Sequence, residues 1–192
     1  DVPGWGWSAW PGAGGAGVQQ GSFGSAVESS TATAVGEIRH VSISDVVAQN
    51  RAAQYACEIV GIPGHEIEDV HISNVRLIWP GGAPAGIEKV VPPENEFMYP
   101  EPGMFGVMPS SAFFIRHVKG ISLTNIDSTC DAKDMRPPFW LEDVQGADFF
   151  NIRAPHEAGV PMFMLKDVTD FHAAAVRGMS DVSREQVESG TL

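Results

Sequence analysis

The chain has 192 residues, 43% of them hydrophobic, which allows a single domain with a substantial core. Twenty-four acidic residues against twelve basic residues give a net charge of −12, which argues against nucleic acid and anionic membrane surfaces as partners. No apolar run approaches the roughly 18 residues that a membrane span requires. The acidic balance is compatible with an exported protein.

Residues 1–36 form a Gly-, Ser- and Trp-rich N-terminal arm that contains Trp5, Trp7 and Trp10. Gly- and Ser-rich composition favours a loop or a linker. The arm is interpreted as a segment that packs its indoles against the rest of the fold or a neighbouring chain. The alternative is a platform on which sugar rings stack.

From residue 37 onward one short phrase recurs five times. It reads IRHVSISDV from Ile38, IEDVHISNV from Ile67, VKGISLTNI from Val118, VQGADFFNI from Val144 and VTDFHAAAV from Val168. Apolar residues recur at the third, fifth and eighth places after the first residue, so we expect these places to point inward. The seventh place holds Asp45, Asn74, Asn125, Asn151 and Ala175. Stacked Asn side chains can hydrogen-bond along such a column.

The first residues of successive copies are 29, 51, 26 and 24 positions apart. Three of these spacings fit one coil of several short strands, and the longest fits one coil plus an insertion. The sequence therefore predicts an all-β fold, a right-handed parallel β-helix (solenoid) of about five coils, over residues 37–178 with a long inserted loop at 81–110. Neither a leucine-rich consensus nor a helical period is present.

The centre of the insertion concentrates Glu94, Glu96, Tyr99 and Glu101. Carboxylates accept hydrogen bonds from sugar hydroxyls, and an aromatic ring offers a stacking surface. A substrate rim and a lid that holds itself in place both fit this composition. Loops that leave a rigid scaffold commonly carry function.

Strand-like segments precede the last three copies, and two of their columns should point outward. One column is apolar, with Phe114, Trp140 and Met164, and the next is charged, with Arg116, Glu142 and Lys166. Alternating charge makes cross-strand neighbours attract. The apolar stripe must be covered, and the inserted loop, a partner chain or a polysaccharide are the alternatives. We expect homo-oligomers to form through the solenoid ends or through this stripe.

Arg136 lies in a turn with several acidic neighbours. Its guanidinium could clamp a uronate carboxylate, or it could pair with those neighbours. Cys57 and Cys130 occupy different columns and are predicted to be free or buried. No His or acid spacing typical of a metal site is present, so we expect no metal and no cofactor. Residues 179–192 form a polar C-terminal tail, either frayed or a short helix, since Ser183 and Gln186 have capping-box spacing.

Four stretches resemble glycoside hydrolase family 28, the polygalacturonase and rhamnogalacturonan hydrolase family, and more closely its bacterial members. They are GHEIEDVHISNVRL from Gly64, YPEPGMFGVMP from Tyr99, RHVKGISLTNI from Arg116 and RPPFWLEDVQG from Arg136. The resemblance covers roughly residues 37–178 and corresponds to the C-terminal half of that family. It implies a pectin lyase-like β-helix, a plant cell-wall polysaccharide or oligosaccharide as ligand, and an extracellular or periplasmic protein.

The resemblance also implies an inverting mechanism with two acids, which the family carries on N-T-D, D-D, G-H-G and R-I-K motifs. None of the four motifs occurs in this chain. The first hypothesis is therefore a polysaccharide-binding module with Tyr99, Glu101, Arg136 and Trp140 as contact residues.

Two alternatives stay open. One is a glycoside hydrolase with a site completed by another chain or with relocated acids, for which Glu94, Glu96 and Glu101 are the catalytic candidates. The other is a structural or oligomerisation module.

Overall fold

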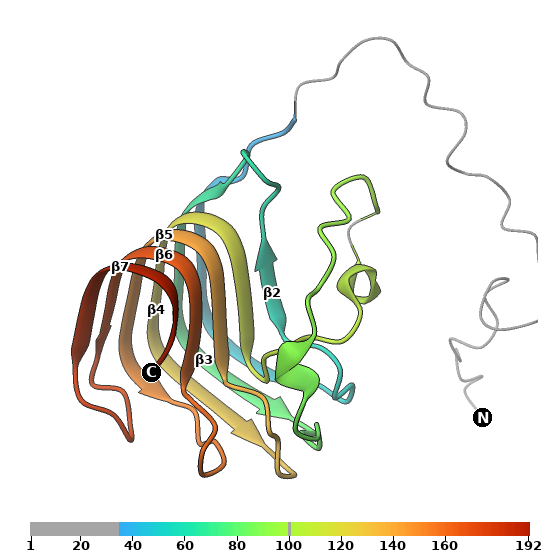
Figure 1. Cartoon of the computed structure of the whole chain (residues 1–192), viewed down its shortest axis with the longest axis vertical. Coiled ribbons are helices and arrows are strands. Elements are labelled where there is room, and N and C mark those ends of the chain that lie inside the picture. The colour runs from blue at the N-terminus through green and yellow to red at the C-terminus, as the bar shows by residue number, and fades with distance from the viewer. Residues whose placement is uncertain (1–34, 100) are drawn as a thin grey trace, which may run out of the picture. The chain divides into compact units, whose positions relative to one another are not determined.

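A computed structural model describes residues 35–99 and 101–192, and Gly36–Leu192 form one compact unit (Figure 1). This unit is mostly β, with one largely parallel sheet of long strands. The described residues contain no α-helix, and none of their helical segments could cross a membrane. The prediction for Trp5, Trp7 and Trp10 lies outside the described residues.

Seven strands form the sheet. In chain order they are β1 (Arg39–Gln49), β2 (Cys57–Val60), β3 (Ile67–Trp79), β4 (Phe113–Cys130), β5 (Phe139–Arg153), β6 (Phe163–Ala174) and β7 (Val182–Thr191). They are arranged β1-β3-β4-β5-β6-β7, and the short β2 pairs with the first residues of β4. The insertion between β3 and β4 contains two short 3-10 helices, η2 (Ile87–Lys89) and η3 (Pro102–Phe105).

The register of the parallel strands matches the alignment of the five sequence phrases. Ile67 lies opposite Val118, Val118 opposite Val144, and Val144 opposite Val168. The predicted ladder is confirmed as well, and each amide donates to the residue on the preceding strand. The Nδ2-to-Oδ1 distances are 3.0 Å from Asn74 to Asp45, 2.9 Å from Asn125 to Asn74 and 2.7 Å from Asn151 to Asn125.

The long strands bend at residues with a left-handed backbone, as the curved ribbons of Figure 1 show. Every residue of the ladder column has a positive φ. A second column of this kind stands two places after the start of each phrase: His40, Asp69, Gly120, Gly146 and Asp170. Asn, Asp and Gly tolerate this conformation better than other residues do. These columns therefore place the corners of neighbouring strands above one another.

Phenylalanine rings form the centre of the core. The ring of Phe139 lies between the stacked rings of Phe113 and Phe163, with centroid distances of 5.7 and 5.1 Å, and meets Phe149 edge-on at 5.3 Å. All four side chains are buried. Such offset and edge-on contacts add to the stabilisation from apolar burial. The predicted inward columns are thus the core of the sheet.

The two ends of the sheet differ. β1 is the edge strand of the sheet within the described part of the chain, and its inward residue Ile43 remains 45% exposed because none of the described strands lies beyond it. At the other end β7 pairs antiparallel with β6, so the expectation of a helix or frayed tail at the C-terminus is wrong. The capping-box spacing of Ser183 and Gln186 indicated a local preference for a helix. The edge of β6 instead offers hydrogen-bond partners to the backbone along the whole segment, and these favour a strand.

Replacing Phe139 by Ala is expected to lower the free energy of unfolding by about 3 to 5 kcal/mol, because it leaves a cavity in the aromatic stack. Phe150→Ala, on the same strand but 54% exposed, should change it by about 0.5 kcal/mol or less. Urea unfolding of the two variants measures both values. Equal losses would contradict the assignment of Phe139 to the core.

Candidate functional site

The insertion covers the outward face of β4 and β5. Phe105 and Met108 from the insertion bury Phe114, and all three side chains are 9% exposed or less. Ala56, Val60, Met104 and Trp140 pack around this cluster. The apolar stripe predicted on this face is therefore covered at Phe114 by the chain's own loop, which was the first of the three alternatives.

Arg116 of β4 holds the insertion in place. Its side chain is 1% exposed, and its two terminal nitrogens donate to the carbonyl oxygens of Pro92 and Pro93, each at 2.9 Å. Nη2 also lies 3.2 Å from Glu94 Oε2. The guanidinium stacks over the rings of Phe105 and Phe114, with its carbon 5.7 and 5.3 Å from the centroids. A planar cation with several donors suits this combined role.

The predicted column of alternating charge is only partly present. Lys166 Nζ donates to Glu142 Oε1 at 2.6 Å, while Arg116 turns to the insertion instead. The alternation in the sequence indicated pairing between neighbouring strands. It contained no signal that a loop's backbone carbonyls would compete for the guanidinium.

His117, the residue after Arg116 on β4, also attaches the insertion to the sheet. Its Nδ1 lies 2.7 Å from Asp143 Oδ2 on β5, and its Nε2 lies 3.0 Å from Glu94 Oε2. The imidazole is buried. Glu94 therefore contacts both Arg116 and His117, so this carboxylate anchors the loop to the sheet.

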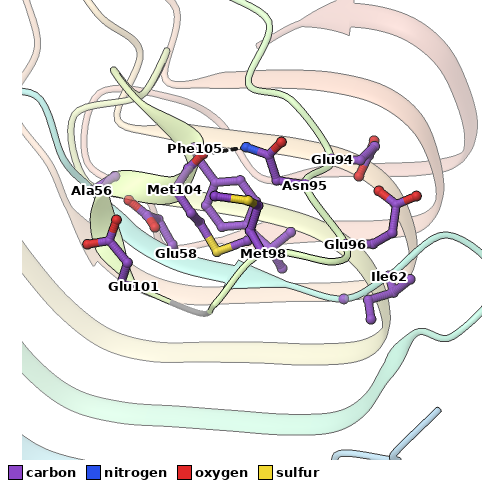
Figure 2. A pocket seen from close by; sticks show the side chains of 12 residues that line it. Ala56, Glu58, Ile62, Glu94, Asn95, Glu96, Met98, Glu101, Met104 and Phe105 are labelled. Atoms are coloured by element: carbon purple, nitrogen blue, oxygen red, sulfur yellow. Dashed lines mark hydrogen bonds between the residues drawn. The ribbon is translucent and has the colours of Figure 1, made fainter. Parts of the chain in front are cut away.

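A pocket of about 570 Å³ opens between the insertion and the β2 region. Its lining residues are Ala56, Glu58, Val60, Gly61, Ile62, Glu94, Asn95, Glu96, Met98, Glu101, Met104 and Phe105. Figure 2 shows Met98, Met104 and Phe105 in the middle, with Glu58 and Glu101 on one side and Glu94 and Glu96 on the other. All three acids proposed from the sequence thus line one cavity.

Gly61 is required where β2 runs into the pocket wall. Its amide donates to the carbonyl oxygen of Arg116 at 2.9 Å, and a Cβ at this position would lie 2.3 Å from the carbonyl oxygen of His117. Only glycine permits this close approach of the two backbones. The β2 region is therefore held directly against the part of β4 that carries Arg116 and His117.

Glu58 is the fourth acid of the pocket and was missed in the sequence. It lies in β2, its Oε1 is buried without a hydrogen-bond partner among the described residues, and its pKa is raised to about 7. Burial is the larger cause, and the charge of Glu101 adds to it. The available signal was a single Glu within the apolar strand segment Cys57–Val60.

The other predicted contact residues lie outside this pocket. Tyr99 is 82% exposed, and Trp140 is half-buried against the Phe114 cluster. Arg136 is buried and bonds both oxygens of Asp134, with Nε 2.9 Å from Oδ1 and Nη2 2.7 Å from Oδ2. Of the two alternatives for Arg136, the structure favours pairing with an acidic neighbour over clamping a uronate.

The two cysteines are free, and burial raises the pKa of Cys57 to about 12 and that of Cys130 to about 11. Thiols with such high pKa values form little thiolate near neutral pH, so neither is suited to act as a nucleophile. Within residues 35–99 and 101–192, no group of three or more His, Cys, Asp or Glu side chains is arranged to hold a metal ion.

Comparison of the chain with models of protein families, with curated proteins and with solved structures gives no match. The assignment of the site therefore depends on the geometry of the described residues.

Arg116→Met is expected to lower the free energy of unfolding by about 2 to 3 kcal/mol, because the buried carbonyl oxygen of Pro92 loses its charged donor. Hydrogen exchange should increase in the insertion more than in β5 and β6. Arg153→Met is the control, since this half-exposed side chain pairs with Asp127 at 3.4 Å, and it should cost about 1 kcal/mol or less. Unchanged protection of the insertion would contradict the anchoring role.

The raised pKa of Glu58 predicts a pH dependence of stability. Between the ordinary value of 4.5 and about 7, the folded protein keeps a proton that the unfolded chain releases. This contribution is present in full below pH 4.5 and is lost as the pH rises to about 7, so stability falls across that window. In urea unfolding at several pH values, Glu58→Gln should reduce the fall in the free energy of unfolding between pH 4.5 and about 7. Glu185→Gln on β7 should leave that fall unchanged. Identical slopes in all three proteins would contradict the assignment.

Proposed function

We propose that this chain is a polysaccharide-binding right-handed parallel β-helix module, and that the pocket beneath the insertion is its ligand site. The observation that carries the proposal is the combination, in one cavity, of four carboxylates with an apolar surface made by Met98, Met104 and Phe105. Carboxylates accept hydrogen bonds from sugar hydroxyls, and apolar side chains pack against the C–H face of a sugar ring. Such pairing of apolar surface with a few polar groups is typical of small-molecule sites.

The arrangement of the strands supports the β-helix part of the proposal. Parallel strands with equivalent residues in register, bent at stacked left-handed corners, are what successive coils of such a solenoid require. The insertion then leaves the scaffold between the second and third coils. Its attachment through Arg116 and His117 keeps the pocket wall in one conformation before a ligand arrives.

Four sequence motifs bear on whether the module binds a polysaccharide or also cleaves it, and their absence favours binding alone. The resemblance to pectin-degrading hydrolases extends to the coils that support chemistry, while the four motifs that carry the acids do not occur. We propose a plant cell-wall polysaccharide as ligand and an extracellular or periplasmic location, both on the basis of that resemblance.

A glycoside hydrolase is the second candidate, and Glu58 is the observation that favours it. A carboxyl that keeps its proton near neutral pH is suited to act as general acid, and a second carboxyl group of the pocket, Glu96 or Glu101, could act as the base that activates water. Glu94 is less suited to this role because it already contacts Arg116 and His117.

Homo-oligomer formation stays a prediction. With Phe114 covered by the insertion, we propose the edge of β1 as the surface for it, because no described strand pairs with this edge and Ile43 and Val47 are exposed there.

Calorimetry against a panel of cell-wall oligosaccharides tests the proposal. Glu96→Gln and Glu101→Gln should each weaken binding about tenfold or more, because a hydrogen bond to a charged group contributes roughly 1.5 to 3 kcal/mol. Glu185→Gln, on β7 and outside the pocket, is the matched control. Binding that none of the pocket variants weakens would exclude this site.

Release of reducing sugars from the same panel separates the two candidates. Binding with no release supports the binding module, whereas release that Glu58→Gln abolishes supports the hydrolase.

A further inference from the structure

Building on the proposed glycan-binding function, we infer that the pocket accepts neutral sugar units and excludes uronates, although the chain resembles a family that degrades pectin. The inference depends on which charges in and around the cavity are already compensated. It narrows the ligand from polysaccharide in general to chains of uncharged or esterified sugars.

No cation lines the pocket among the described residues. Arg116 and Arg136 already have partners within the protein. Arg116 bonds the carbonyl oxygens of Pro92 and Pro93, and Arg136 is paired with Asp134. A uronate carboxylate entering the cavity would lose water without gaining the Arg or Lys partner that buried carboxylates need.

The four acids of the pocket differ in their charge. Glu94 is compensated by Arg116 Nη2 at 3.2 Å, while burial and the charge of Glu101 raise the pKa of Glu58 to about 7, so this carboxyl is largely protonated at pH 6. Glu96 and Glu101 are exposed at the rim, and neither forms an ion pair with another described residue. These two repel a uronate at the entrance. A cationic amino sugar is attracted to the same rim, but inside the cavity its ammonium group would lose water without gaining a buried counter-charge, since Glu94 is already paired with Arg116.

The same distribution supplies both kinds of hydrogen-bonding group that a neutral sugar needs. A protonated Glu58 can donate to a ring or hydroxyl oxygen, whereas Glu96 and Glu101 accept from hydroxyls. Asn95 Nδ2 donates to the carbonyl oxygen of Met104 at 2.5 Å, which leaves its Oδ1 as a further acceptor. The apolar middle of the cavity, formed by Met98, Met104 and Phe105, suits the uncharged face of the ring (Figure 2).

A matched pair of ligands tests the inference: an oligogalacturonate and its fully methyl-esterified form, which share one backbone and differ in charge. Calorimetry at pH 6 should give at least tenfold tighter binding of the ester. A neutral galactan oligosaccharide and a chitosan oligomer of equal length complete the panel. Tighter binding of the free acid or of chitosan than of the neutral ligands would overturn the inference, while the glycan-binding function would stand. If no ligand binds, the glycan-binding function itself fails, and the inference fails with it.

Variants add a second measurement. Affinity for the neutral ligand should fall as the pH rises through about 7 and Glu58 loses its proton, and Glu58→Gln should remove this dependence. Glu96→Lys should improve binding of the free acid about tenfold by placing a cation at the rim, whereas Glu185→Lys on β7 should not. Unchanged binding of the free acid by Glu96→Lys would overturn the charge argument.

Discussion

The contact of one buried cation, Arg116, with a loop determines where the insertion lies on the sheet. The side chain of Arg116 extends from β4 and donates hydrogen bonds to two carbonyl oxygens of the insertion. It also forms an ion pair with a carboxylate of the insertion. Desolvating a guanidinium is costly, so it is tolerated only where several acceptors surround it. The insertion is thereby attached over the apolar outer face of β4, where it forms one wall of the pocket.

The sheet beneath provides the rigidity that this arrangement needs. Equivalent residues of successive strands lie in register, so stacked phenylalanines fill the core and stacked amides link the corners. Residues that tolerate a left-handed backbone stand at those corners, such as Asn74 and Gly120. A strand that bends at fixed places carries its outward side chains to fixed places as well. Arg116 and His117 are consequently presented together at the start of β4.

The pocket illustrates how environment separates chemically identical groups. Glu58 and Glu94 both line it, yet one is kept protonated by burial and the other is compensated by a cation and an imidazole. Glu96 and Glu101 are exposed at the solvent edge of the pocket. The cavity therefore offers a donor, several acceptors and an apolar surface, with its negative charge confined to the rim.

The sequence alone determined the repeat, its register, the inward columns and the Asn ladder, because each of these recurs at equivalent positions such as Asn74 and Asn125. It also indicated that Glu94, Glu96 and Glu101 belong to one functional loop. Only the tertiary structure decided that Glu58 joins them, that Arg136 is already paired, and that the C-terminal segment is a strand. These features depend on contacts between segments distant in the chain, where neither periodicity nor local preference carries the information.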